Sequence, residues 1–121
     1  MELILEPRVG FLLATASGKL SFHEAVENCR NMCDFAAGLG VRKILFDCLA
    51  LEGDLSREER FELGKTIVEH CRSRLRVSRV ALIGKPPSVN GYAARVAAEG
   101  GIPVEMFSDR ELGLDWLKTR P

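Results

Sequence analysis

The sequence predicts an α/β fold: a mixed, mostly parallel β-sheet with an N-terminal hairpin and helices packed on it. Two observations predict this class. Short apolar segments alternate along the chain with longer segments whose apolar residues recur at helical spacing, as they do in βαβ units. Before that alternation starts, two apolar segments are separated by a tight connection, which indicates an antiparallel pair.

The first three elements are the two strands of the hairpin and a helix. Strands are expected at Leu3–Leu5 and Val9–Ala16, on either side of a turn at Glu6-Pro7-Arg8. A helix follows because apolar residues recur three and four positions apart over Phe22–Ala36, after which glycines end the pattern.

The remaining elements alternate between short apolar strands and amphipathic helices, with residues 49–54 as a loop. In order they are the strand Val41–Cys48, a helix marked by Phe61, Gly64, Val68, Cys71 and Leu75, the strand Val80–Ile83, a helix over Val89–Ala97, the strand Ile102–Phe107 and the helix Arg110–Lys118. The order ββαβαβαβα implies parallel strands joined by helical crossovers. The whole chain, residues 1–121, is expected to fold as a single domain.

Three of the predicted helices are preceded by the pattern Ser-x-x-Glu, at Ser21, Ser56 and Ser108. In this pattern the serine oxygen accepts a free N–H of the first turn, and the glutamate accepts the N–H of the serine. We therefore predict that all three serines cap helices.

Charge and hydropathy exclude several classes of partner. The 17 Lys and Arg residues balance 17 Asp and Glu residues, so no net field attracts nucleic acid. The longest apolar runs, such as Val80–Ile83, are far shorter than the ~20 residues that cross a bilayer. The N-terminus shows no secretion signal, so no membrane insertion and a cytoplasmic location are expected.

The four cysteines, Cys29, Cys33, Cys48 and Cys71, are predicted to be reduced, buried and without a metal. Cys29 and Cys33 share a helix face, and the neighbouring His70 and Cys71 could complete a metal site. The closely spaced cysteine pairs of structural zinc sites are absent, however, and core packing accounts for the same positions. We expect no metal and no cofactor.

Several segments resemble the STAS-like family, which includes the anti-sigma factor antagonists and their SpoIIAA-like relatives. Gly18-Lys19-Leu20-Ser21 is similar to the phrase that opens the first helix of these proteins, and Lys43–Asp47 is similar to their strand that ends in aspartate. Phe107–Glu111 with Trp116-Leu117 resembles their C-terminal phrase. The resemblance covers essentially the whole chain and implies a STAS/SpoIIAA-like fold with a protein partner.

In the phosphorylated antagonists the next loop carries Asp-Ser-Ser-Gly, and a partner kinase phosphorylates its serine. Asp54 and Ser56 match the aspartate and the second serine, but Leu55 and Arg57 replace the other two residues. The resemblance therefore implies a partner-binding loop without an intact phosphorylation motif.

A second candidate region is the turn Gly84–Gly91, between a strand and a helix. Lys85, Ser88 and Asn90 are the anion-binding candidates here, because a helix start offers free N–H groups to an anion. The phosphate-loop order is absent, and Pro86-Pro87 removes two donors. The competing interpretation is a rigid turn capped by Ser88 or Asn90.

No arrangement of residues predicts catalysis, since His23 and His70 both fall within helices rather than beside a nucleophile. Asp47, Asp54 and Ser56 are the candidate partner-binding or switch residues, because ligands of open α/β sheets lie beyond strand ends. The sequence favours a non-catalytic regulatory or protein-interaction domain resembling the anti-sigma factor antagonists. Two alternatives stay open: a domain that binds a small molecule, either a lipid or an anion, and, less favoured, a small enzyme that uses a loop carboxylate.

Overall fold

The computed structural model describes residues 1–74 and 79–119, and the strands in this part of the chain form one mixed sheet. β1 pairs antiparallel with β2, and the later neighbours pair in parallel, in the order β1-β2-β3-β4-β5. The elements are β1 (Glu2–Arg8), β2 (Phe11–Lys19), α1 (Phe22–Leu39), β3 (Lys43–Glu52), α2 (Arg57–Arg74), β4 (Arg79–Ile83), α3 (Tyr92–Glu99), β5 (Val104–Phe107) and α4 (Arg110–Lys118). The predicted class and the order ββαβαβαβα are confirmed.

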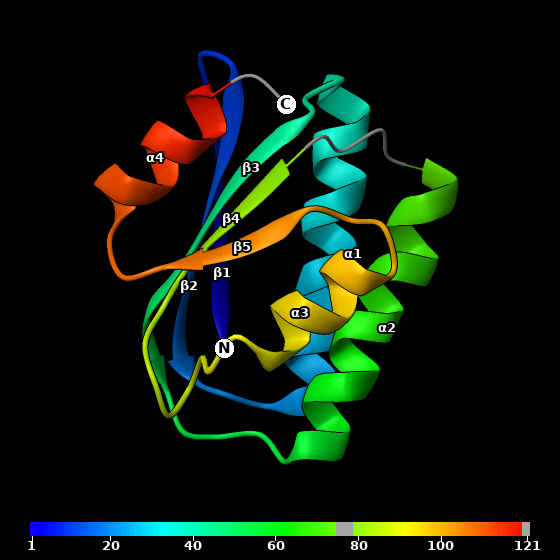
Figure 1. Cartoon of the computed structure of the whole chain (residues 1–121), viewed down its shortest axis with the longest axis vertical. Coiled ribbons are helices and arrows are strands. Elements are labelled where there is room, and N and C mark those ends of the chain that lie inside the picture. Colours follow the sequence, from blue (N-terminus) through cyan, green and yellow to red (C-terminus); the bar gives the residue numbers. More distant parts are fainter. Residues whose placement is uncertain (75–78, 120–121) are drawn as a thin grey trace.

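The sheet separates two helical layers (Figure 1). Helices α1, α2 and α3 cover one face, and α4 lies on the other face against β3, β4 and β5. Neighbouring residues of β2 point into different layers, because side chains alternate along a strand. Leu12 and Ala14 belong to the core under α1, whereas Leu13 packs with Leu117 of α4. The larger core therefore lies between the sheet and α1–α3.

The hairpin turn lies later in the chain than predicted. β1 continues through Pro7 and pairs Arg8 with Phe11, so Val9 and Gly10 form the turn. Gly10 has a φ of +83°, a left-handed backbone conformation that glycine adopts without strain. Pro7 is tolerated because β1 is an edge strand.

The third strand is longer than predicted. β3 includes residues 49–52, which the sequence assigned to a loop. A register shift occurs just before Ser17 of β2, and pairing with β3 then resumes as far as Lys19 opposite Glu52. Asp47, predicted at the end of the strand, consequently lies within it.

Other elements differ from the prediction at their first residues. α3 begins at Tyr92 rather than at Val89, and β5 begins at Val104 rather than at Ile102. Leu75, predicted on the apolar side of the second helix, lies outside the described residues.

The three predicted serine caps have different outcomes. Ser56 caps α2 as predicted. Ser21 occupies the N-cap position of α1, but its side chain makes no capping hydrogen bond. α4 is capped by Asp109, whose Oδ1 accepts the Leu112 N–H at 2.9 Å, so the prediction for Ser108 is wrong.

Cys33 of α1 and Cys71 of α2 are joined in a disulfide, with their Cα atoms 6.3 Å apart. The prediction of four free thiols is therefore wrong for this pair, which meets because α1 and α2 pack side by side. Cys29 and Cys48 are free and buried. Burial raises the pKa of Cys29 to about 12. Burial also raises the pKa of Cys48 well above its usual value, and nearby Cys29 and Asp47 add to that effect.

Candidate functional site

Arg60, near the start of α2, is a buried charged residue, at 5% exposed. Its Nε donates to the carbonyl oxygen of Leu55 at 3.2 Å, and its Nη1 donates to that of Ser88 at 3.1 Å. Its Nη2 donates to the carbonyl oxygen of Pro87 at 2.7 Å and to Asp54 Oδ1 at 2.5 Å. Arg60 therefore ties the loop after β3 to the loop after β4, at the carboxyl ends of two neighbouring parallel strands.

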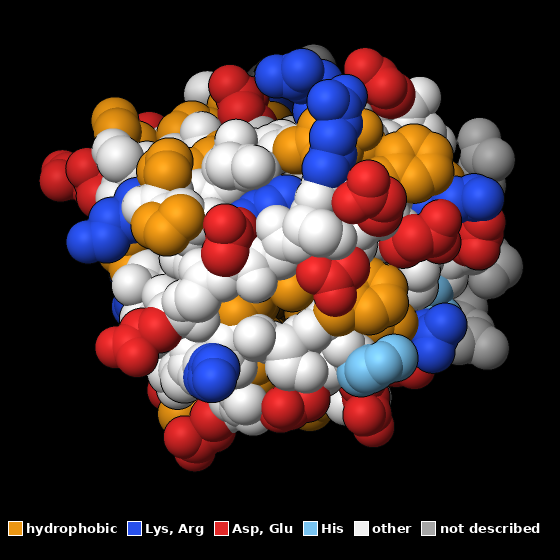
Figure 2. Space-filling model, turned by 90° about the horizontal axis from the view of Figure 1, so that it is seen from below, with side chains coloured by type: hydrophobic (Ala, Val, Ile, Leu, Met, Phe, Trp, Pro, Cys, Tyr) orange, Lys and Arg blue, Asp and Glu red, His pale blue; other side chains and the backbone are white. Residues whose placement is uncertain are grey.

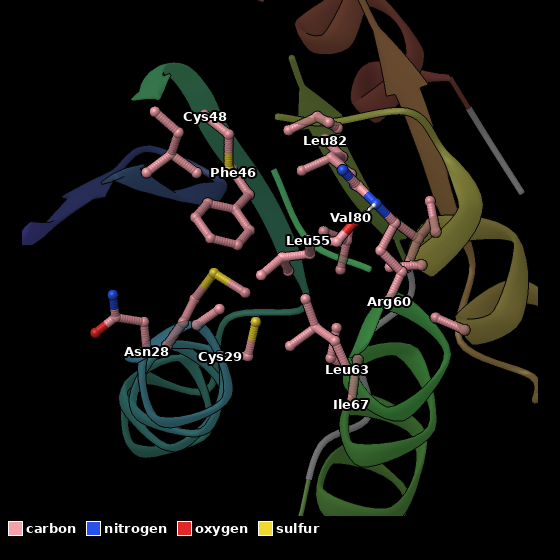
Figure 3. Close-up of a pocket in the computed structure, with 18 of the residues that line it drawn as sticks. Asn28, Cys29, Phe46, Cys48, Leu55, Arg60, Leu63, Ile67, Val80 and Leu82 are labelled. Carbon is pink, nitrogen blue, oxygen red and sulfur yellow. Dashed lines mark hydrogen bonds between the residues drawn. The ribbon is translucent and has the colours of Figure 1, made fainter. Parts of the chain in front are cut away.

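A cavity of about 90 Å³ lies between the sheet and helices α1–α3, and Arg60 forms part of its wall. Figure 3 shows Arg60 reaching from α2 to Leu55, with Phe46 of β3 across the cavity. Leu63 and Ile67 of α2 line the cavity beside them.

Asp54 is the exposed counter-ion of the buried Arg60, with 66% of its side chain accessible. Its Oδ1 accepts a second hydrogen bond, from the Leu55 N–H at 2.8 Å. The hydrogen bond from Arg60 holds the pKa of Asp54 below its usual range, against the opposing effect of partial desolvation. Asp54 is therefore ionised and paired with Arg60 at neutral pH.

Ser56 and Glu59 form the reciprocal bonds of a capping box. Ser56 Oγ accepts the Glu59 N–H at 3.1 Å, and Glu59 Oε1 accepts the Ser56 N–H at 2.8 Å. These bonds fix the first turn of α2. Because Arg60 follows directly in the sequence, the capping box also sets the direction from which Arg60 enters the core.

Asp47 does not join Asp54 and Ser56 in one site. Its buried carboxylate accepts the Leu49 N–H at 3.0 Å and pairs with Arg110 Nε at 2.5 Å. Arg110 is the first residue of α4, on the opposite face of the sheet from α2. Asp47 thus anchors α4 to β3, and the surface expected to run from Asp47 to Ser56 is divided between the two layers.

Lys85, Ser88 and Asn90 lie in the loop after β4. Asn90 Oδ1 accepts the Tyr92 N–H at 3.0 Å, which occupies a donor at the start of α3. The Ser88 carbonyl oxygen accepts from Arg60, and the Lys85 side chain is exposed. This geometry fits the capped turn better than an anion cradle, because Asn90 presents an oxygen where an anion would need a donor.

An open depression borders Arg60 on the surface, between the starts of α2 and α3. Arg57 lies over the ring of Tyr92, with its Cζ 5.1 Å from the ring centroid, and Arg95 lines the same depression. Phe61, one turn after Arg57 on α2, is 43% exposed although the sequence placed it on the apolar side of its helix. Figure 2 views the molecule from this end and shows acidic, basic and hydrophobic side chains intermingled, without a patch of one charge.

The two histidines lie on α1 and α2. His23 is exposed, and His70 Nε2 lies 2.8 Å from Asp34 Oδ1. Within residues 1–74 and 79–119, no group of three or more His, Cys, Asp or Glu side chains could hold a metal ion. No helix in the same part of the chain is long and apolar enough to cross a membrane.

Nothing in the sequence predicted a role for Arg60, because an arginine in a helix that begins with four consecutive charged residues is expected in solvent. One sequence signal could have pointed to it. Leu63 and Ile67, three and seven positions later, share its helical face and are apolar.

Comparisons with known proteins agree with this architecture. No family model matches the sequence, and no curated protein matches it. Among solved structures, an anti-sigma factor antagonist from Mycobacterium paratuberculosis has a TM-score of 0.67 at 13% identity, covering 98% of this chain and 94% of that one. The anti-sigma factor antagonist SpoIIAA in its unphosphorylated form has a TM-score of 0.56 at 20% identity, covering 97% and 98%. The chain therefore has the fold of STAS domains.

A further solved structure is more similar in sequence. It is an uncharacterised protein of the DUF3478 family, with a SpoIIAA-like fold, from Shewanella loihica. It has a TM-score of 0.56 at 29% identity and covers 96% of this chain and 92% of its own. In particular, then, the fold is SpoIIAA-like, as the resemblance in the sequence implied.

Proposed function

We propose that this chain is a non-catalytic regulatory domain that acts by binding a protein partner. Two of the similar structures are anti-sigma factor antagonists, and their likeness covers nearly the whole chain. In this proposal residues 1–121 form one domain, which acts in the cytoplasm on a partner of the anti-sigma factor type.

The observation that carries this proposal is the exposed surface at the start of α2. Phe61 presents an aromatic ring that is 43% exposed one turn after Arg57 on α2, and the exposed residues Asp54 and Ser56 lie in the loop that leads into the same helix. Arg57 and Tyr92 stack at the edge of the same surface. Aromatic residues and arginine are the types most enriched where protein partners bind tightly, so this surface has suitable chemistry for a partner.

Partner binding through this surface does not require phosphorylation. The Ser56 hydroxyl already accepts the Glu59 N–H, and Leu55 stands where the phosphorylated antagonists have a serine. We therefore propose a partner surface whose occupancy depends on the conformation of the loop and of α2. Ser56 contributes to it by capping the helix.

The test uses Phe61→Ser with Phe35→Ser as its matched control. Phe35 lies on α1 and is 39% exposed, so both variants remove a half-exposed phenylalanine from a helix. The tagged domain is isolated from the cells in which it is naturally made, after cross-linking, and its partners are identified by mass spectrometry. We expect Phe61→Ser to lose an anti-sigma-factor-like partner that the wild type and Phe35→Ser retain. Equal recovery with all three proteins would refute this surface.

A further inference from the structure

We propose that the cavity beside Arg60 binds a small carboxylic acid with a compact, branched apolar tail, whose carboxylate takes the place of Asp54 on Arg60. This binding is independent of the protein partner and goes beyond the function proposed above. It assigns a ligand class to the cavity and a recognition role to its buried charge.

The walls of the cavity select an apolar tail. Phe46 and Val80 of the sheet, together with Leu63 and Ile67 of α2, surround the space with carbon atoms. Apolar surface that enters such a cavity leaves water, which is favourable in proportion to its area. The volume of about 90 Å³ is smaller than the roughly 150 Å³ of an apolar cavity that accepts benzene, so the tail must be short.

The buried guanidinium selects a carboxylate. The side chain of Arg60 is 6% exposed, and its hydrogen bonds use four of its five N–H donors, which leaves one donor on Nη1. Asp54 pairs with Arg60 through a single oxygen, Oδ1. A ligand carboxylate that reached both Nη1 and Nη2 would form the bidentate pair that guanidinium groups favour.

Exchange of the counter-ion is compatible with the surrounding fold. Asp54 is 66% exposed, so its carboxylate can rotate into water when a ligand replaces it. The bonds from Arg60 to the carbonyl oxygens of Leu55 and Ser88 do not involve Asp54 and can persist. The two loops therefore stay tied while one carboxylate substitutes for another, and the charge of Arg60 remains paired.

The experiment compares sodium isovalerate with isovaleramide, which has the same tail but no charge. Binding to the full chain is followed by the methyl resonances of Leu63 and Ile67, which line the cavity. We expect saturable shifts with isovalerate, with a Kd on the order of millimolar for so small a ligand. Isovaleramide should bind at least about tenfold more weakly, because it cannot form a charge-assisted pair.

Two pairs of variants locate the site. Asp54→Asn removes the competing charge, so it should increase the affinity for isovalerate about fivefold and leave the affinity for isovaleramide unchanged. Arg60→Met should abolish the preference for isovalerate over isovaleramide. Ala94→Val adds carbon atoms to the cavity wall and should weaken isovalerate about tenfold, while Ala98→Val, exposed on the same helix, should leave it unchanged.

The outcomes separate cleanly even if Arg60→Met fails to fold, because Asp54→Asn reports on the same guanidinium. No saturable shift at 50 mM isovalerate would overturn the proposal. So would equal affinity for the acid and the amide, or equal effects of Ala94→Val and Ala98→Val. Equal recovery of the protein partner by the wild type, Phe61→Ser and Phe35→Ser, together with saturable isovalerate binding, would count against the proposed function alone.

Discussion

Removing the hydroxyl of Ser56 should destabilise the domain by about 1 kcal/mol, within the roughly 0.5–2 kcal/mol observed for loss of an N-cap side chain. Ser56→Ala leaves the Glu59 N–H without its acceptor at 3.1 Å, but that group lies near solvent and can bond to water. The expected loss therefore lies in the middle of the range. For a domain of this size it corresponds to a fall in Tm of about 4 °C.

Thermal and urea unfolding of matched variants checks this expectation. Ser56→Asp keeps an acceptor at the positive end of α2 and should retain wild-type stability. Ser21→Ala is the control, because Ser21 is also an N-cap residue but its side chain makes no capping bond, so its loss should be within about 0.5 kcal/mol of zero. Equal losses at Ser56 and Ser21 would refute the capping argument. Stoichiometric phosphate on Ser56 in protein from its natural cells would show that its hydroxyl has a regulatory role.

Three further predictions concern the core. Gly64→Ala should lower the free energy of unfolding by about 1–3 kcal/mol, because its new Cβ would lie 2.7 Å from a backbone oxygen of α3. Gly38→Ala, whose new Cβ would lie in open space, should raise the free energy of unfolding by about 0.5–1 kcal/mol. Changes of the same sign in chemical unfolding would contradict this expectation. At pH 8 a thiol reagent should label neither Cys29 nor Cys48 in the folded protein, because their raised pKa values keep both thiols protonated. After unfolding, the reagent should label two thiols in the absence of a reductant and four thiols in its presence. Labelling of four thiols without reductant would exclude the disulfide. Trp116→Ala should cost about 3 kcal/mol, at the low end for an aromatic core residue because its ring is partly exposed, and a loss below about 1 kcal/mol would mark the ring as free for a partner.

The candidate site was predicted in part. The sequence identified Asp54 and Ser56 from their likeness to a family loop, and the structure places both at the start of α2. It also grouped Asp47 with them, but the Asp47 carboxylate pairs with Arg110 of α4, on the opposite face of the sheet from α2. The sequence predicted no role for Arg60, which joins the two loops and lines the cavity. Burial of its charge depends on hydrogen-bond acceptors that come from distant segments of the chain.

Local chemistry in the sequence by itself determined the class and order of the elements. The period of the apolar residues distinguished strands from helices, and α4 has the predicted bounds, Arg110–Lys118, because its pattern and cap lie within a few consecutive residues. The capping box at Ser56 was readable for the same reason, since both of its partners lie three residues apart.

The tertiary structure decided every feature that depends on residues far apart in the chain. β3 continues as a strand through residues 49–52 because β2 offers backbone partners there. Cys33 meets Cys71 because α1 and α2 pack together, and Gly64 differs from Gly38 because α3 crosses one and not the other. Such contacts arise from packing between elements, and the periodicity of any single segment carries no record of them.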